Sequence, residues 1–418
     1  MRVRLSIART RCWTWWTGHS GLRSDAWLYG ASAVFAVTLG WTSSQAAQWQ
    51  WGYLAVGPYV TAAVAALVLS RMRLRRATLA RIVLLGVVLV GTFAVPLALE
   101  ARWRQAQPEV SVISRAGTDI TKGINPYTSY ILHGHLVHAV PGVPAYESFF
   151  PYFPLMGVFG LPSADTHQSK ELTDARIVMS LLTLLASGAA LALMRASRDK
   201  KIRLAQVLLA LPTGALFLST GGDDMPILAL MLLGVVGLQR RQSNLAGISI
   251  GLAAAMKLTA WPLALGAVLV AHGERDRSAW RRIAGWCAAI VVVTVAPFAV
   301  RAPWAFFSNV FEFPLGLAGV ASPAASALPG HILTTLWSPA GHVLTPLTFL
   351  VGGYFVVKYV RARWPLDLST MLRVLAVSFT VMMCAASATR IGYLIYPLNL
   401  AMWAWALQEA PVKAKVLV

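Results

Sequence analysis

Long apolar runs separated by short basic segments constrain the fold of this chain more than any other feature. A helix that crosses a bilayer needs about 20 mostly apolar residues. Only 12% of the 418 residues are charged, which is about half the share found in soluble domains. Runs of nearly spanning length recur at 26–44, 53–70, 82–99, 174–194, 203–220, 283–300, 342–359, 368–386 and 392–408. The sequence therefore predicts an all-α integral membrane protein.

A more crowded apolar stretch lies near the middle of the chain. Residues 225–272 divide into 225–239, 243–256 and 258–272, each of which is short for a full span. Tilted or partly buried helices are expected there. With these segments, the chain is predicted to form a bundle of about 12 transmembrane helices.

Basic residues gather in the segments between the apolar runs and set the expected orientation. Loops rich in Lys and Arg stay in the cytoplasm. This rule predicts a multi-pass protein of the cell membrane with both termini in the cytoplasm. The segments expected on the outer side are 100–173, 221–224, the segment around Lys257, 301–341 and 387–391. The basic clusters are Arg71 to Arg81, Arg195 to Arg203, Arg240 with Arg241, Arg275 to Arg282, and Lys358 to Arg363.

The net charge of +20 follows from the same rule, so it does not indicate a nucleic-acid partner. Cys12, Cys287 and Cys384 are scattered, and their spacing predicts neither a disulfide framework nor a zinc site. The basic, Trp-rich segment from Met1 to Trp16 has no signal-peptide core. It is expected to lie at the cytoplasmic interface.

The expected outer loop 100–173 is the most polar part of the chain, and it also carries many aromatic residues. A loop of this length is usually functional or disordered, and its apolar and aromatic content argues against disorder. Within it, Ile120 to Val140 is predicted to be a short amphipathic helix along the membrane surface. Residues 149–162 are predicted to be a re-entrant or interfacial helix, because they are too few to span. The loop is interpreted either as part of an active site or as a cap over the bundle.

Several motifs of this chain resemble those of one family. Glu109 is followed at a spacing of fourteen by Gly123, then by Asn125-Pro126-Tyr127 and by Phe150-Pro151-Tyr152-Phe153-Pro154-Leu155. These resemble the first outer loop of glycosyltransferase family 87, the polyprenol-phosphate-mannose-dependent α-mannosyltransferases of the GT-C fold, which reads D-x-x-x-Y, G-x-x-P-Y and Y-P-P-L. Residues 221–226, 257–262 and 389–397 are similar to further blocks, so the resemblance covers roughly 80–408.

The resemblance implies a GT-C-type glycosyltransferase core at 81–410. An N-terminal segment with two extra helices (1–80) would precede it, and a cytoplasmic tail (411–418) would follow it. It further implies that a sugar, with mannose favoured over arabinose, leaves a polyprenyl-phosphate donor with inversion. The acceptor would be a glycolipid or a cell-envelope glycan on the extracytoplasmic side. Membrane lipids are the other expected partner, and no cofactor is required.

The resemblance also suggests roles for individual residues. Glu109 is the expected base, although the family usually has aspartate there and tyrosine where this chain has Ile113. Asp119 is the alternative base. The other expected site residues are Lys257, Arg390 and Tyr393 for the donor phosphate, and Asp223, Asp224, Tyr127, His133 and Tyr152 for the acceptor.

Other interpretations stay open for some of these residues. Lys257 interrupts an apolar run, where a cation is usually paired or functional, but it can also snorkel to the interface. Asp223 and Asp224 are either an N-cap pair or a pair that orients hydroxyls or binds a divalent cation. His133 is expected to contact substrate or solvent rather than a metal. A transporter or flippase of a lipid-linked sugar, and a non-catalytic lipid-binding assembly protein, are the alternative functions.

Overall fold

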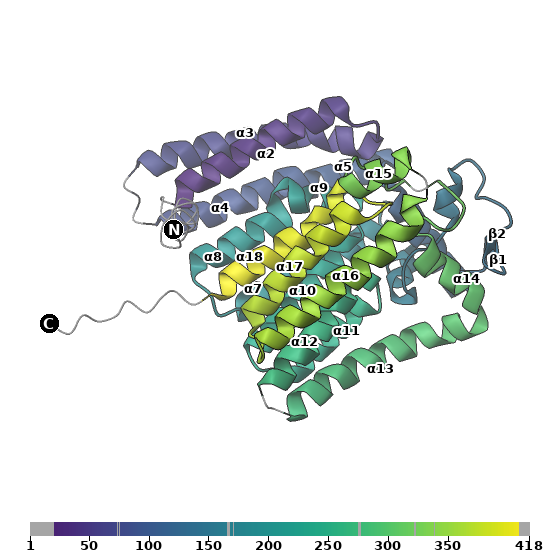
Figure 1. Cartoon of the computed structure of the whole chain (residues 1–418). Coiled ribbons are helices and arrows are strands. Elements are labelled where there is room, and N and C mark those ends of the chain that lie inside the picture. The colour runs from purple at the N-terminus through teal and green to yellow at the C-terminus, as the bar shows by residue number, and fades with distance from the viewer. Residues whose placement is uncertain are drawn as a thin grey trace. The chain divides into compact units, whose positions relative to one another are not determined.

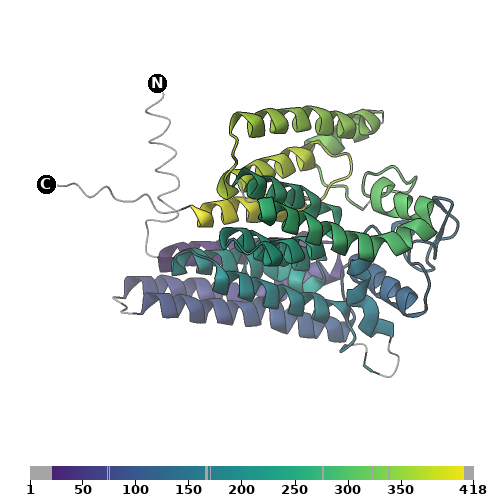
Figure 2. The same ribbon diagram turned by 90° about the horizontal axis from the view of Figure 1, so that it is seen from below.

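The computed structural model describes residues 21–72, 74, 76–164, 168–169, 171–274, 277–321, 323–337 and 339–408. The segments expected at the cytoplasmic interface (1–16) and in the tail (411–418) lie outside these residues. The regular secondary structure of the described part is helical, as predicted, apart from one two-stranded hairpin and an isolated bridge between Ala325 and Thr389 (Figure 1, Figure 2). It forms two compact units, one from Met1–Gln107 with Ser197–Gly222 and one from Pro108–Ala196 with Asp223–Val418.

The first unit is a bundle in which two helices contain a π-helical segment. Such a segment changes the backbone hydrogen-bond pattern and leaves carbonyl groups that need other donors. Trp51 Nε1 donates to the Thr92 carbonyl at 2.7 Å, and the Tyr59 hydroxyl donates to the Ala210 carbonyl at 2.7 Å. The elements of the unit are α2 (Gly21–Thr42), α3 (Ala46–Arg71), α4 (Ala77–Leu89), η1 (Val90–Ala94), α5 (Val95–Trp103), α8 (Arg198–Ala205), η4 (Gln206–Ala210) and α9 (Pro212–Thr220).

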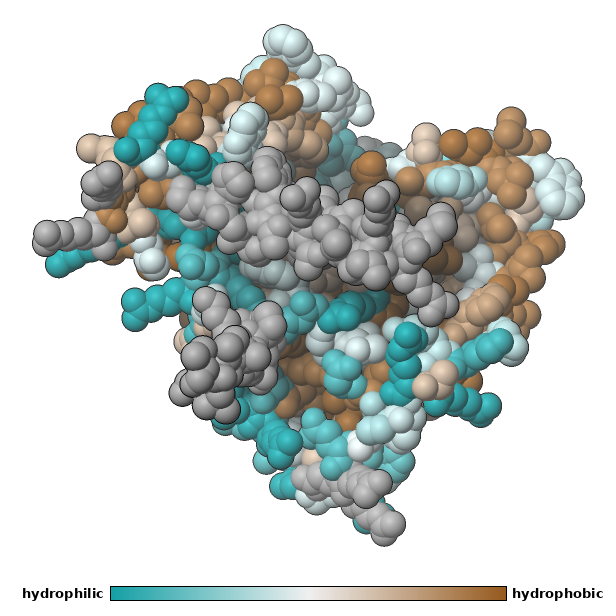
Figure 3. All heavy atoms as spheres, turned by 60° about the vertical axis from the view of Figure 1, so that its left-hand side comes forward, coloured by the Kyte–Doolittle hydropathy of each residue, from teal (hydrophilic) through white to brown (hydrophobic). Residues whose placement is uncertain are grey.

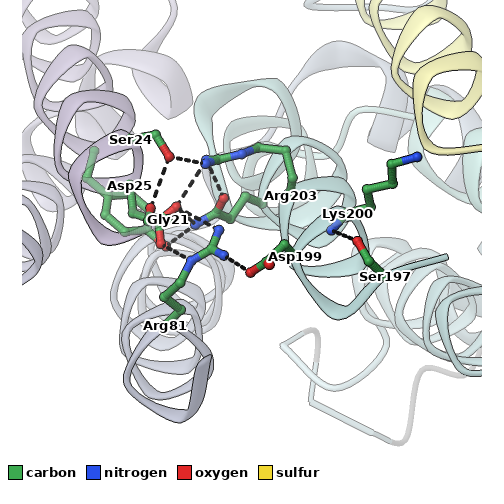
Figure 4. A network of polar contacts seen from close by, with 10 residues as sticks. Gly21, Ser24, Asp25, Arg81, Ser197, Asp199, Lys200 and Arg203 are labelled. Carbon is green, nitrogen blue, oxygen red and sulfur yellow. Dashed lines mark hydrogen bonds and ion pairs between the residues drawn. The ribbon is translucent and has the colours of Figure 1, made fainter. Parts of the chain in front are cut away.

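A buried group of polar residues joins α2, α4 and α8 within the first unit (Figure 4). We call Asp25, Arg81, Arg203 and Gln206 the Asp25 cluster. Arg81 donates to both carboxylate oxygens of Asp25, at 2.6 and 3.1 Å, and Arg203 Nη1 lies 3.1 Å from the same carboxylate. Gln206 donates to Asp25 at 3.1 Å. These contacts fix three helices at one point.

The second unit holds most of the chain. Its first part contains α6 (Pro108–Thr121), β1 (Ile131–Leu132), β2 (His135–Leu136), η2 (Ala145–Ser148), η3 (Pro154–Ala164) and α7 (Ala175–Leu193). Its second part contains α10 (Asp224–Gln239), α11 (Ser243–Ala254), η5 (Leu258–Ala260), α12 (Trp261–Gly273), α13 (Arg277–Arg301), α14 (Pro303–Phe307), η6 (Ser308–Glu312), α15 (Pro329–Leu336), α16 (Ala340–Ala362), α17 (Leu368–Ala385), η7 (Ile391–Leu394) and α18 (Ile395–Leu407).

The predicted division of 225–272 is confirmed, because α10, α11 and the η5–α12 pair occupy its three parts. Six helices of the described chain are long and apolar enough to cross a membrane, and five shorter apolar helices accompany them. The predicted total of about 12 spans goes beyond these six and stays a prediction.

Apolar side chains on the surface agree with a multi-pass membrane protein. Val293 on α13 is 72% exposed and Leu350 on α16 is 73% exposed. Figure 3 shows large brown apolar areas, with teal hydrophilic residues gathered between them. Apolar surface of this extent requires a partner or a lipid solvent.

The predicted helix from Ile120 to Val140 is wrong. Helix α6 ends at Thr121, and β1 and β2 pair antiparallel across the two-residue turn His133-Gly134. Both turn residues have positive φ, at 50° and 87°, as a tight hairpin turn of this kind requires. Gly123 also has positive φ and Pro126 follows closely. These breakers therefore overrode the amphipathic pattern.

Residues 149–162 contribute to η3, a 3₁₀ helix of 11 residues. It packs directly on α6, because Gly117 and Gly160 let the two backbones touch. A Cβ added to either glycine would lie 2.1 Å from backbone atoms of the other segment. This contact fixes the position of α6. The placement of η3 relative to a membrane stays a prediction.

Candidate active site

Short connections bring chemically active residues to one end of the second unit. Helix α10 packs against α11, α12 and α18. Helices joined by short connections run antiparallel. The end of α11 therefore lies beside the start of α10, and the α11–α12 connection follows directly after it. Asp223 and Asp224 stand at that start, and Lys257 stands in that connection.

Lys257 lies between the two aspartates. Its Nζ donates to Asp223 Oδ2 at 2.7 Å and to Asp224 Oδ1 at 2.6 Å. The two carboxylates are 8% and 9% exposed and the lysine side chain 13%. Lys257 is therefore paired and mostly covered, with its charge held by the two aspartates.

Two further residues complete the aspartate side of this group. The Tyr396 hydroxyl donates to Asp224 Oδ1 at 2.6 Å, and Thr259 Oγ1 donates to the Tyr396 hydroxyl at 2.8 Å. They fix the rotamer of Asp224. The sequence predictions did not include either role. Their only signal was position, since Thr259 follows Lys257 by two residues and Tyr396 lies in the block 389–397.

Glu109 and Arg390 form a second ion pair in the same unit. Arg390 Nη1 donates to Glu109 Oε1, with the two side chains 29% and 12% exposed. Glu109 stands in the first turn of α6, where the helix dipole favours a negative charge. Its second oxygen, Oε2, is buried and has no hydrogen-bond partner among the described residues. Glu109 thus has one carboxylate oxygen without a hydrogen bond among the described residues.

The two ion-paired groups belong to one site, because their charges act on shared neighbours. Burial raises the pKa of Asp223 to about 7 against the opposing charge of Lys257, and the charges of Asp224 and Glu109 raise it further. Burial alone would lower the pKa of Lys257, but Asp223 and Asp224 hold it well above its ordinary value. We call Glu109, Asp223, Asp224, Lys257 and Arg390 the Lys257 cluster.

Aromatic residues surround Lys257. Its Nζ lies 5.4 Å from the ring centre of Tyr152 and 5.6 Å from that of Tyr393. Burial raises the pKa of Tyr152 well above its ordinary value. Tyr127 stands behind this layer: it is fully buried and its hydroxyl donates to the Tyr152 carbonyl at 2.6 Å. Tyr127 therefore supports Tyr152 and is not open to a substrate.

Two of the expected site residues lie outside this arrangement. Asp119 is ten residues beyond Glu109 on the same helix, roughly 15 Å along its axis, and its carboxylate accepts a hydrogen bond from Ser129 at 2.6 Å. His133 is exposed in the hairpin turn. The structure brings together Glu109, Asp223, Asp224, Lys257, Arg390, Tyr152 and Tyr393, and leaves Asp119 and His133 apart.

Asn309 holds the loop in place and is absent from the sequence predictions. It is buried in η6, accepts a hydrogen bond from the Phe150 amide at 2.6 Å and donates to the Tyr127 carbonyl at 3.3 Å. A single amide within an aromatic, apolar segment was the available signal, because buried polar groups need partners.

Metal ligands do not gather elsewhere in the described residues, which contain no group of three or more His, Cys, Asp or Glu side chains placed to hold an ion. The nearest arrangement is the pair Asp223 and Asp224, and the Lys257 ammonium bridges it.

Comparison with known proteins gives one positive finding. The model of glycosyltransferase family 87 matches residues 150–388, more than half of the chain. The match includes Tyr152, Asp223, Asp224 and Lys257, while Glu109 and Arg390 lie outside its limits. Comparison with curated proteins and with solved structures finds no match.

Proposed function

The chain belongs to glycosyltransferase family 87, and from this we propose that it moves a sugar from a polyprenyl-phosphate carrier to a glycolipid or cell-envelope glycan. Mannose is the first candidate sugar and arabinose the second. We further propose that the reaction takes place on the extracytoplasmic side of the cell membrane. The segments that carry the Lys257 cluster alternate along the chain with the basic connections expected in the cytoplasm, which supports this placement.

The state of Glu109 carries the proposed mechanism. One carboxylate oxygen is held by Arg390 and the other is buried without a partner among the described residues. A carboxylate oriented in this way suits a general base. In the proposed reaction the acceptor hydroxyl gives its proton to Glu109, and its oxygen attacks the anomeric carbon. The bond from that carbon to the phosphate oxygen breaks, and polyprenyl phosphate leaves with inversion.

The cations of the cluster suit the leaving group. Positive charge near a phosphate stabilises the negative charge that grows on it during displacement. Lys257 and Arg390 are the proposed phosphate ligands, with Tyr393 beside Lys257. Asp223 and Asp224 hold Lys257 in place and are the proposed contacts for acceptor hydroxyls.

Transfer with Glu109→Gln tests the function and the base together. Purified protein is given radiolabelled polyprenyl-phosphate mannose and membrane glycolipid, and labelled product is measured. The substitution keeps the size and polarity of the side chain but removes the base, so the rate should fall by about 100- to 10,000-fold.

Asp119→Asn is the matched control, because it removes a carboxylate from the same helix that lies apart from the cluster. It should retain most of the transfer. Unchanged transfer in Glu109→Gln would rule out the base assignment. An absence of transfer with every lipid-linked sugar would rule out the proposed donor.

A further inference from the structure

Lys257 occupies a position with the chemistry of a metal site. Two adjacent carboxylates supply oxygens at 2.7 and 2.6 Å from its Nζ, and Tyr396 braces one of them. Carboxylate oxygens are the ligands that hard divalent cations prefer. Here the cation between them belongs to the chain itself.

The backbone holds the ammonium at this point. The Lys257 amide donates to the Ala253 carbonyl at 3.2 Å, and the neighbouring Met256 carbonyl accepts from the Phe153 amide at 2.9 Å. The rings of Tyr152 and Tyr393 flank the side chain. Backbone and rings together define where the positive charge sits.

The ammonium has the donors to act toward a phosphate. It carries three N–H groups, and two of them are used by Asp223 and Asp224. The third N–H group of Lys257 has no hydrogen-bond acceptor among the described residues, so it can donate to a phosphate oxygen. A divalent metal in a transferase site performs the same two tasks, holding carboxylates and binding phosphate.

The charge of the site also fits one ammonium. If both aspartates are ionised, their two negative charges exceed the single positive charge of Lys257. The Tyr396 hydroxyl donates to Asp224 Oδ1 at 2.6 Å and stabilises that carboxylate, so one ammonium is sufficient between the pair.

We propose that the Lys257 ammonium is the resident cation of this site and takes the place of a divalent metal, so that sugar transfer requires none. The catalytic part of this inference rests on the proposed function. The cation site itself does not, because it is defined by contacts within the chain.

Binding of Mn²⁺ tests the site without any assay of activity. Full-length wild type, Lys257→Ala and the double variant Lys257→Ala with Asp224→Asn are titrated with Mn²⁺, and free Mn²⁺ is followed by electron paramagnetic resonance. Lys257→Ala should bind one Mn²⁺ per chain, and the other two proteins should bind at least about tenfold more weakly. Binding to wild type at these aspartates, or no binding to folded Lys257→Ala, would overturn the proposal.

Transfer assays with a chelator test the catalytic part. Wild type should keep its full rate in EDTA, whereas Lys257→Ala should lose about 100-fold and recover at least tenfold with Mn²⁺. A wild-type rate abolished by EDTA and restored by Mg²⁺ would overturn the proposal even if Lys257→Ala does not fold. Failure of transfer under all conditions would count against the proposed function, and the Mn²⁺ titration would still decide the site.

Discussion

Each of the two units contains a buried group of charged side chains, and the two groups differ in how fully their polar atoms are paired. In the Asp25 cluster, both oxygens of the central carboxylate accept hydrogen bonds from arginine or glutamine. In the Lys257 cluster, Glu109 Oε2 is buried with no partner among the described residues. A network in which every polar atom is paired stabilises the fold, whereas an unpaired carboxylate oxygen in a buried site can accept a proton.

The clusters also differ in the balance of their charges. Asp25 is fully buried with two arginines, and the additional carboxylate that contacts Arg81 comes from Asp199, which is 74% exposed. The Lys257 cluster has three carboxylates for two cations, all partly or wholly buried. An excess of buried carboxylates is costly for stability and is typical of functional sites. The comparison predicts that substitutions in the first cluster change stability and those in the second change transfer.

The largest effect is expected from Asp25→Ala. The change removes the carboxylate shared by Arg81 and Arg203 and leaves two buried guanidinium groups without it. Breaking a buried pair in this way costs about 3–5 kcal/mol. The midpoint of thermal unfolding in detergent should fall, while transfer per folded molecule should not change.

Asp199→Ala is the control for this variant, since it removes the exposed carboxylate bonded to the same Arg81. It should cost no more than about 1 kcal/mol. Equal destabilisation by the two substitutions would break the comparison. So would a loss of transfer in folded Asp25→Ala.

A smaller effect, on rate rather than stability, is expected from Arg390→Met. Arg390 is 29% exposed, so its loss disturbs packing less than the loss of Asp25. Removing one group that stabilises a developing negative charge slows a reaction by about 100-fold or more. The initial rate of transfer at saturating donor measures this change.

Arg301→Met is the matched control, because Arg301 ends α13 and is exposed. It is expected to anchor lipid headgroups and should leave the rate unchanged. A rate that survives Arg390→Met while the unfolding midpoint drops would place Arg390 with the structural residues and remove it from the phosphate site.

Periodicity and length predicted where the long apolar helices lie, but they did not predict α6 (Pro108–Thr121), the helix that carries Glu109. The runs at 174–194 and 368–386 correspond to α7 (Ala175–Leu193) and α17 (Leu368–Ala385) within a few residues. The hairpin at 131–136 was not predicted, because His133-Gly134 is a weak turn signal and the surrounding residues also fit a helical pattern. Turn chemistry at two residues overrode the longer pattern.

The positions of charged residues in the sequence identified the site residues, but they did not identify the partners of these residues. Lys257, Asp223 and Asp224 were each singled out because charge is costly beside apolar helices, but their direct pairing depends on tertiary packing between α10 and the α11–α12 connection. The same limit applied to Arg81 and Arg203. They were assigned to basic clusters on the cytoplasmic side with no partner predicted, and the structure buries both against Asp25.

The smallest effect is expected from pH, and it concerns Asp223. Its pKa rises from 3.8 to about 7 on folding, mainly through burial, with Lys257 opposing and Asp224 and Glu109 reinforcing the shift. The folded state therefore holds a proton that the unfolded state releases. This contribution to stability is complete below pH 3.8 and is lost as the pH rises through about 7. Between pH 5 and pH 8 the unfolding midpoint should therefore fall as the pH rises.

Asp223→Asn separates this contribution from all other titrating groups, since its amide has no proton to release in this range. The difference between the wild-type and variant midpoints should change with pH below about 7 and become constant above it. Parallel curves would mean that Lys257 keeps Asp223 ionised throughout, because a fully compensated carboxylate does not titrate there. The two clusters would then be alike in protonation, and the unpaired oxygen of Glu109 would be the remaining difference between them.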